Sequence, residues 1–224
     1  MKNQYIPVIT LDGPSASGKG TIARLVSQAL GFHYLDSGVL YRLVALAAMK
    51  RNVDTSDEQK VVGIARCLEA SFADSLIWLN GVDVSDAVRA EACGEYASQI
   101  AQYPALRAAL LERQRNFRKP PGLVADGRDM GSVIFPDAML KIYLTASEEE
   151  RACRRHKQLM EKGINASIAE LIQALRERDE RDSKRVASPL QQCEDTCLLD
   201  TTGLDIDQVV GKVLGMYADS GNTG

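Results

Sequence analysis

The stretch VITLDGPSASGKGT, residues 8–21, joins a β-prone run, a glycine-rich loop and the beginning of a helix. The run from Val8 to Leu11 predicts a buried strand that ends at Asp12. Beyond Lys19, apolar residues recur at helical spacing as far as residue 30, and Gly31 follows as a stop signal. The stretch therefore predicts a strand, a loop and a helix in immediate succession.

The loop is suited to binding a phosphate chain. Such a chain carries several negative charges, and converging backbone N–H groups at a helix N-terminus bind it well. Gly13 and Gly18 allow the required loop, and Lys19 supplies a cation for the β- and γ-phosphates, as in the Walker A pattern G-x-x-x-x-G-K-[ST]. Gly20 stands where that pattern has a hydroxyl residue, and Thr21 follows it, which weakens the case for a hydroxyl ligand to Mg²⁺. The alternative is an ordinary β–α turn with a chance lysine.

Composition limits the class of protein. A chain of 224 residues with 45% hydrophobic and 25% charged residues can form one principal domain with a small insert. A net charge of −3 gives no general reason to expect nucleic-acid or membrane binding. The longest apolar run, residues 43–49, is too short to span a bilayer, and five scattered cysteines without a C-x-x-C pair indicate reduced thiols. We therefore expect a cytoplasmic protein.

A cation stands at the beginning of the next predicted helix. A short strand over residues 32–35 leads to Asp36 and Ser37, either of which could cap a helix over residues 39–51. Arg42 lies in the first turn of that helix, where a positive charge opposes the helix dipole. An anionic ligand would explain its presence.

Residues 52–120 show a different pattern of predicted elements from the rest of the chain and are interpreted as an insertion. Ser56 and Gln59 form a capping-box pattern, which predicts a helix ending near Ala70. The remaining predicted elements are a hairpin turning at Asn80-Gly81 over residues 77–84 and helices over residues 86–101 and 104–118. This combination suggests a substrate-binding lobe, and a purely structural elaboration is the alternative.

A second apolar strand, over residues 122–127, ends in charged residues. Its end at Asp126 and Gly127 is similar to the buried strand whose acidic residue faces a phosphate-binding loop. In doubly wound folds, ligands lie at the carboxyl ends of parallel strands, so Arg128 and Asp129 are expected beside the phosphates. A polar turn without function is the alternative.

Two later helices carry many arginines. Capping-box patterns at Ser147 and Ser167 begin these helices. The apolar stripe of the second helix turns charged at its far end; the stripe runs through Ile168, Leu171, Leu175, Arg178, Asp182 and Arg185. Burying unpaired arginines in a dry core costs several kcal/mol, so this half is expected to face a charged ligand or water, as part of an arginine-rich lid. A solvated, self-paired helix end is the alternative.

Taken together, the motifs resemble those of the bacterial cytidylate kinases, within the nucleoside monophosphate kinases. They are G-P-S-A-S-G-K-G-T at 13–21, L-D-S-G-V-L-Y-R at 35–42, A-S-Q-I-A at 97–101, D-G-R-D-M-G at 126–131 and E-R-D-E-R-D at 177–182. The resemblance implies one α/β domain over residues 1–224 with a P-loop fold, in which helices flank a five-stranded parallel sheet. Its parts would be a monophosphate-binding lobe at 52–120 and a helical lid at 147–186. The polar composition of residues 219–224 predicts a loose tail.

The resemblance further implies transfer of the γ-phosphoryl group of ATP to CMP or dCMP, with Mg²⁺ accompanying ATP. The implied catalytic residues are Lys19, Arg42, Arg128 and Arg185. The implied ATP-binding residues are Gly13, Pro14, Ser15, Ala16, Ser17, Gly18, Lys19, Gly20 and Thr21. The implied CMP-binding residues are Ser37, Arg42, Ser98, Arg107, Arg128, Asp129, Arg178, Asp182 and Arg185. Among these, Ser98, Arg107 and Asp129 would read the cytosine, and Arg178 and Asp182 would bind the pentose.

The expected partners are small molecules, ATP and CMP or dCMP, and the resemblance favours a monomer that binds neither nucleic acid nor membrane. Two alternatives stay open. The nearer is a P-loop kinase with another acceptor, such as UMP, AMP or a small hydroxyl compound. The more distant is a nucleotide-dependent switch, which would need a guanine-reading N-K-x-D motif that the sequence lacks.

Overall fold

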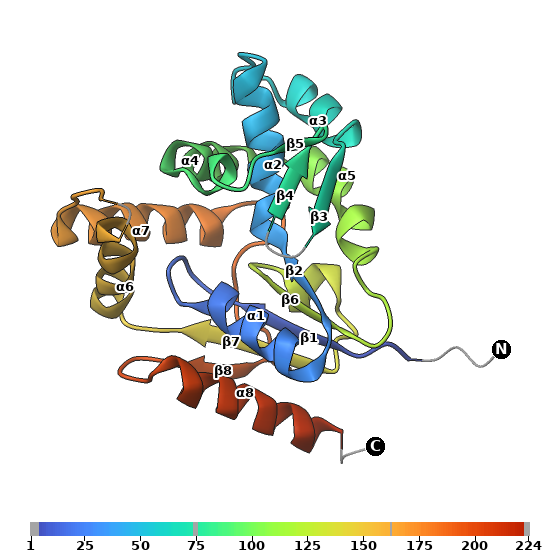
Figure 1. Ribbon diagram of the computed structural model, residues 1–224, viewed down its shortest axis with the longest axis vertical. Coiled ribbons are helices and arrows are strands. Elements are labelled where there is room, and N and C mark those ends of the chain that lie inside the picture. Colours follow the sequence, from blue (N-terminus) through green and yellow to red (C-terminus); the bar gives the residue numbers. More distant parts are fainter. Residues whose placement is uncertain (1–4, 74–75, 162, 222–224) are drawn as a thin grey trace. The chain divides into compact units, whose positions relative to one another are not determined.

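A computed structural model describes residues 5–73, 76–161 and 163–221 (Figure 1). The chain forms two compact units. One consists of the chain up to Leu35 and from Phe117 onward, and the other is Asp36–Asn116. Each unit is described in turn.

The first unit is built on a five-stranded sheet. Its strands are β1 (Val8–Asp12), β2 (His33–Asp36), β6 (Leu123–Gly127), β7 (Leu140–Thr145) and β8 (Cys197–Asp200). Their order is β2-β6-β1-β7-β8, and β1 runs parallel to both of its neighbours. Every residue of β1 and of β6 is buried, as is typical of central strands covered on both faces. The predicted α/β class and parallel five-stranded sheet are confirmed.

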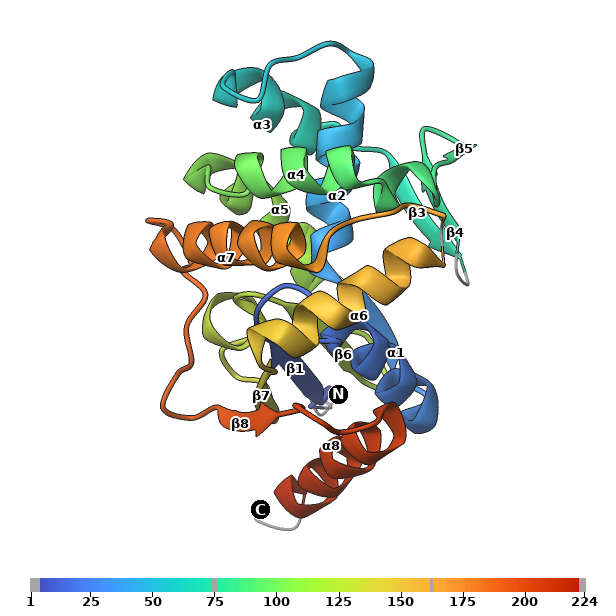
Figure 2. The ribbon, with the colours of Figure 1, turned by 90° about the vertical axis from the view of Figure 1, so that its left-hand side faces the viewer.

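Two helices of this unit pack together against the sheet, α1 (Lys19–Leu30) and α8 (Ile206–Ser220) (Figure 2). Gly31 ends α1 with φ 66°, as predicted. Helix α8 begins with a capping box formed by Asp205 and Gln208. The helix continues to Ser220, into the stretch predicted to be a loose tail, and residues 222–224 lie outside the described part of the chain.

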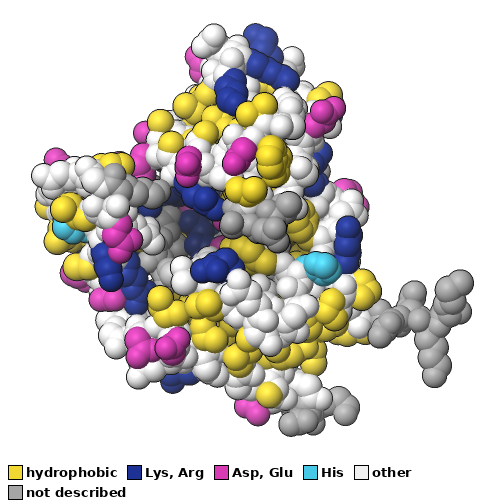
Figure 3. Space-filling view, in the orientation of Figure 1, with side chains coloured by type: hydrophobic (Ala, Val, Ile, Leu, Met, Phe, Trp, Pro, Cys, Tyr) yellow, Lys and Arg dark blue, Asp and Glu magenta, His cyan; other side chains and the backbone are white. Residues whose placement is uncertain are grey.

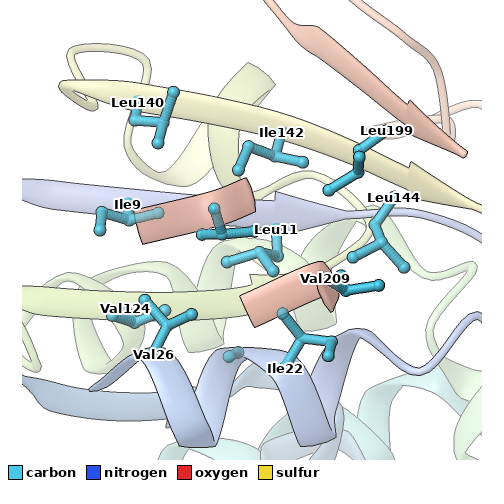
Figure 4. Packing of buried hydrophobic residues seen from close by; sticks show 12 residues of the cluster. Ile9, Leu11, Ile22, Val26, Val124, Leu140, Ile142, Leu144, Leu199 and Val209 are labelled. Atoms are coloured by element: carbon cyan, nitrogen blue, oxygen red, sulfur yellow. The ribbon is translucent and has the colours of Figure 1, made fainter. Parts of the chain in front are cut away.

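The hydrophobic core of the first unit fills the space between the sheet and these helices (Figure 4). Helix α1 contributes Ile22 and Val26, and α8 contributes Val209 and Val213. The sheet side chains in the same cluster are Ile9, Leu11, Val124, Leu140, Ile142, Leu144 and Leu199. Burying one side chain of this size contributes about 1.5–3 kcal/mol, so the cluster fixes β1 and α1, the two elements that hold the glycine-rich loop between them.

The predicted lid consists of α6 (Glu148–Met160) and α7 (Ile168–Lys184), which pack against each other. The Ser147 hydroxyl accepts a 3.2 Å hydrogen bond from the Glu150 amide, and Ser167 and Glu170 form a reciprocal capping box on α7. Both predicted helix starts are therefore confirmed. Arg185, predicted to lie on the helix, follows its last residue in extended conformation.

The second unit contains four α-helices and a small antiparallel sheet among its described residues. The helices are α2 (Ser37–Lys50), α3 (Glu58–Arg66), α4 (Glu91–Ile100) and α5 (Pro104–Arg115). The strands are β3 (Ala70–Ala73), β4 (Leu76–Leu79) and β5 (Val82–Asp83), in that order. Helix α2 packs against α3 and α4, so the unit begins at Asp36, whereas the expected insertion begins at residue 52.

Local signals within this unit were partly correct. The Asp36 carboxylate caps α2 by accepting from the Val39 amide at 3.2 Å. Asn80 and Gly81 both have positive φ, 51° and 75°, as a primed hairpin turn requires.

The predicted cap of α3 at Ser56 is wrong. Asp57 performs that function by accepting from the Lys60 amide at 3.1 Å. A carboxylate at this position caps the helix as well as a serine would, which the capping-box pattern does not distinguish. The predicted extension of α3 to Ala70 is also wrong, because residues 70–73 pair with β4 as strand β3.

The surface fits the near-neutral composition. Figure 3 shows acidic and basic side chains interspersed with hydrophobic ones across one face. Within the described residues, no helix is long and apolar enough to cross a membrane. The five cysteines are free; Cys93 is buried, whereas Cys67, Cys153 and Cys197 are exposed.

Candidate active site

The glycine-rich loop has a backbone conformation that depends on glycine and on positive φ angles. Gly13 has φ 153°, and a Cβ there would lie 2.0 Å from the Leu144 carbonyl oxygen, so only glycine fits. Ala16 and Gly18 have φ 58° and 92°, and Gly18 directly precedes α1. Successive turns of this kind gather N–H groups around an anion at the positive end of a helix. Ser17 is only 1% exposed, and its hydroxyl has no hydrogen-bond partner within the described residues.

Lys19 lies buried at the end of this loop. Its Nζ donates a 3.1 Å hydrogen bond to the Pro14 carbonyl. Burial and the neighbouring charge of Arg128 together lower the pKa of Lys19 to about 7, while Asp126 acts in the opposite direction. A polyanion bound in the loop would favour the protonated amine.

The expected acidic residue lies beside the loop. Asp126, near the carboxyl end of β6, accepts a 2.7 Å hydrogen bond from the Tyr34 hydroxyl. A Cβ on Gly20 would lie 3.7 Å from Asp126 Oδ2, so the carboxylate borders the first turn of α1. Sequence reasoning did not identify Tyr34, whose hydroxyl reaches Asp126 from another strand.

Ser15 is the point where α6 and α7 reach the glycine-rich loop. Its amide donates to Asp179 Oδ1 at 3.0 Å, and its carbonyl accepts from Arg151 Nη1 at 3.0 Å. Its hydroxyl accepts from Arg128 Nη2 at 2.9 Å, and Arg151 also pairs directly with Asp179. Helices α6 and α7 therefore hold both backbone polar groups of one loop residue.

A buried ion pair joins α7 to the residue after β6. Arg128 Nε donates to Asp182 Oδ2 at 2.7 Å, and Arg185 Nη1 lies 3.8 Å from the other carboxylate oxygen. Burial acts to lower the pKa of Arg128, but the charge of Asp182 outweighs it and the net shift is upward. Burial likewise acts to raise the pKa of Asp182, and Arg128 turns the net shift downward. Both groups are therefore ionised.

This pairing decides between the alternatives for the charged half of α7. Asp182 and Arg185 are only 6% and 8% exposed, so a solvated, self-paired helix end is wrong. The charge of Arg178 acts on both Lys19 and Asp182, lowering the pKa of each. The structure therefore brings Lys19, Arg128 and the charged half of α7 together.

Asp12 connects β1 to the loop that contains Arg128 and Asp129. Its carboxylate accepts from the amides of Met130 and Gly131 at 2.9 and 2.8 Å, and burial raises its pKa to about 6. These amides begin a π-helical turn, Met130–Ile134, directly after the buried Asp129. Sequence reasoning missed this role, although a carboxylate ending a buried strand was a usable signal.

The second unit holds the remaining predicted residues. The Arg42 guanidinium is half-buried, and its Nη1 donates to the carbonyl oxygens of Val88 and Ala90 at 2.8 and 3.2 Å. Arg107 is buried; its Nη1 donates to the Ala101 carbonyl at 3.1 Å, and its Cζ lies 5.4 Å from the centre of the Tyr41 ring. Such a cation–π contact fixes the plane of the guanidinium.

The predicted site residues thus fall into two sets, one in each compact unit. Ser37, Arg42, Ser98 and Arg107 belong to the second unit, and Ser37 and Ser98 are both buried. The glycine-rich loop, Arg128, Asp129, Arg178, Asp182 and Arg185 belong to the first. Because buried polar side chains normally have hydrogen-bond partners, the buried members of each set belong to a polar interior and not to a solvated surface.

Comparisons with known proteins agree on one family. The family model for cytidylate kinase matches residues 9–219. A cytidylate kinase of Nitrosomonas eutropha is 86% identical over 99% of both chains, and one of Burkholderia mallei is 57% identical over 96% of this chain and 94% of its own. A gluconokinase structure from Sinorhizobium meliloti has a TM-score of 0.50 at 15% identity, covers 97% of this chain and 94% of its own, and so supports the fold alone. The chain belongs to the cytidylate kinase family.

Proposed function

We propose that this chain transfers the γ-phosphoryl group of ATP to CMP or dCMP, giving ADP and CDP or dCDP. The observation that carries the proposal is the glycine-rich loop before α1, with its positive-φ residues and the buried Lys19, in a chain of the cytidylate kinase family. A loop of this kind binds a nucleotide phosphate chain, and the family indicates the acceptor.

The ATP phosphates would lie against backbone N–H groups of the glycine-rich loop, to which Pro14 contributes none, and the Lys19 amine. The Lys19 amine donates to a carbonyl oxygen, and its lowered pKa reflects burial beside other cations. Phosphate oxygens would replace that carbonyl and compensate the positive charge. The Ser17 hydroxyl is a further donor available to a phosphate oxygen.

The residues beside the loop fit Mg²⁺ that arrives with ATP. Within the described residues, no group of three or more His, Cys, Asp or Glu side chains could hold a metal ion by itself. Mg²⁺ commonly binds through one or two carboxylates together with substrate phosphates and water, and Asp126 offers such a carboxylate next to the loop. When bound, the ion would neutralise part of the negative charge on the phosphate chain.

In the second unit, Arg42 would bind the acceptor phosphate while Ser37 orients it, and Ser98 and Arg107 would read the base. Cytosine presents an amino donor next to acceptors, so a carboxylate such as Asp129 combined with such donors recognises it. Uracil reverses part of this pattern and would leave buried groups unpaired, which can discriminate strongly. Arg178 and Asp182 would bind the pentose.

The reaction needs positioning and charge neutralisation more than a general base. An oxygen of the acceptor phosphate, already a dianion near neutral pH, attacks the γ-phosphorus as the bond to the β-bridging oxygen breaks. Arg128 and Arg185 would bind the migrating group, since a guanidinium contacts two phosphate oxygens at once. The contacts of α6 and α7 with Ser15 would help to exclude the water that could otherwise accept the phosphoryl group.

The proposal also includes a monomeric protein that works in the cytoplasm on small-molecule substrates. Sedimentation of the nucleotide-free protein would check the first point. A phosphotransferase of the same fold with UMP, AMP or a small alcohol as acceptor is the remaining alternative.

The proposal is tested by an ADP-release assay with Mg·ATP and CMP, dCMP, UMP or AMP. We expect rapid turnover with CMP and dCMP, slow turnover with UMP and AMP, and loss of all turnover in Lys19→Ala. Preferred turnover with another acceptor would contradict the cytosine assignment and leave the phosphotransferase intact. Full activity in Lys19→Ala would contradict the assignment of the loop.

A further inference from the structure

Gly94 lies in the middle of α4, buried, and directly against the Arg42 side chain. A Cβ on Gly94 would lie 2.5 Å from Arg42 Nη2 and 2.9 Å from both Cζ and Nη1. Distances below 3.0 Å do not occur between such atoms, so any side chain at this position would displace the guanidinium.

The same helix end also supplies the carbonyl oxygens that hold Arg42. Arg42 Nη1 donates to Val88 and to Ala90, and Ala90 is the residue that precedes α4. The Ala90 carbonyl accepts the Gly94 amide as well, at 3.1 Å. A guanidinium moved away from Gly94 would therefore also move away from these two oxygens.

Glycine is otherwise a poor choice inside a helix, because it has greater freedom in the unfolded chain than alanine. Gly63 shows the contrast within the same unit. It too lies inside a helix, α3, but nothing lies within 4 Å of the position its Cβ would take. Contact with Arg42 gives a physical reason for glycine at position 94 that is lacking at position 63.

We propose that Gly94 is a positioning residue for binding of the acceptor phosphate: its lack of a side chain leaves room for the Arg42 guanidinium to bind the carbonyl oxygens of Val88 and Ala90. This inference rests on the proposed role of Arg42 in binding the phosphate of CMP. Gly94 itself need not touch the substrate. Its effect on binding passes entirely through the position of one guanidinium.

The variant Gly94→Ala tests the inference in steady-state kinetics. We expect KM for CMP to rise about tenfold, the effect of weakening one charge-assisted hydrogen bond, with KM for ATP unchanged. Gly63→Ala is the matched control, since it makes the same change in a helix of the same unit without meeting another side chain. It should leave both KM values unchanged.

A double-mutant cycle with Arg42→Ala separates positioning from general damage to the fold. If Gly94 acts through Arg42, Gly94→Ala should raise KM for CMP in the wild-type background and have no effect in the Arg42→Ala background. An equal effect in both backgrounds, or a parallel rise in KM for ATP, would overturn the inference.

The two proposals fail in different ways. A normal KM for CMP in Gly94→Ala, with a raised KM in Arg42→Ala, would refute the role of Gly94 and keep that of Arg42. A normal KM for CMP in Arg42→Ala would refute the proposed role of Arg42, and the inference about Gly94 with it.

Discussion

Two arginines from the two compact units are held in opposite ways. Arg128 is paired with the buried Asp182 carboxylate at 2.7 Å, whereas Arg42 is held by the carbonyl oxygens of Val88 and Ala90. A carboxylate compensates a full charge, and a carbonyl dipole compensates only part of one. The Arg128–Asp182 pair is therefore nearly neutral as a unit, while Arg42 is oriented and keeps most of its charge for a ligand.

The two arginines need different contacts because they differ in burial. A buried guanidinium without a counter-ion is costly, so Arg128 needs Asp182 while no phosphate is bound. Arg42 is half-buried, can reach water, and needs only orientation. We infer that loss of Arg42 affects catalysis more than folding, and that loss of Asp182 affects the packing of α7 first.

The largest effect is expected for Arg42→Ala. Removing an oriented cation from the acceptor phosphate should lower kcat/KM for CMP by about 10²–10³-fold, as removal of one transition-state donor does in other enzymes. The melting temperature should change little, because the lost contacts are half-exposed. Arg42→Lys, which keeps the charge but loses the fork, should lie between the two proteins. A normal kcat/KM with CMP in Arg42→Ala would contradict the proposal that Arg42 binds the acceptor phosphate.

A smaller effect is expected for Asp182→Asn. It leaves Arg128 and Arg185 without their shared counter-charge, and breaking a buried pair typically costs about 3 kcal/mol. Amide hydrogen exchange in α7 should therefore become about a hundredfold faster.

Glu180→Gln is the matched control on the same helix. Its pair with Lys184 is exposed on both sides and screened by water, so its loss should leave amide exchange in α7 nearly unchanged. Equal exchange rates in Asp182→Asn and Glu180→Gln would show that the Arg128–Asp182 pair does not hold α7 in place.

The smallest effect concerns Lys19, a cation in a third kind of environment. Because its pKa is lowered to about 7, the amine is mostly neutral at pH 8 and mostly protonated at pH 6. Bound phosphates favour the protonated form, so ATP binding should take up most of a proton at pH 8 and much less at pH 6. The affinity for ATP should weaken about fivefold between pH 7 and pH 8.

Calorimetry of ATP binding in buffers with different ionisation enthalpies measures this uptake. Lys19→Arg is the control, since arginine stays protonated throughout and ATP contributes its own protons equally to both titrations. The same uptake in wild type and Lys19→Arg would contradict a lowered pKa at Lys19.

Local patterns predicted much of the fold. Residues close in sequence determine several features that were predicted. These are the boundaries of β1 and α1, the end at Gly31, the caps at Asp36 and Ser167 and the turn at Asn80-Gly81. Strand β3 was missed because it forms by pairing with β4, and its first residue, Ala70, was assigned to the end of the preceding helix. Such tertiary pairing overrides local preference.

Residue types predicted the charged groups of the site but not their partners. The spacing on α7 marked Arg178, Asp182 and Arg185, yet it did not show that Arg128 would pair with Asp182 across 54 positions of the chain. The same holds for Asp179 and Ser15, which are 164 positions apart. Contacts at such separations depend on how elements pack, and a single sequence contains no direct signal for them.

The most direct test of the account is to titrate CMP and cytidine separately into wild type and Arg42→Ala. Cytidine lacks the phosphate, so the ratio of the two affinities isolates what the phosphate contributes. We expect wild type to bind CMP much more tightly than cytidine. In Arg42→Ala the ratio of CMP affinity to cytidine affinity should fall at least about tenfold, with the cytidine affinity nearly unchanged. An unchanged ratio would contradict the claim that Arg42 keeps its charge for the acceptor phosphate.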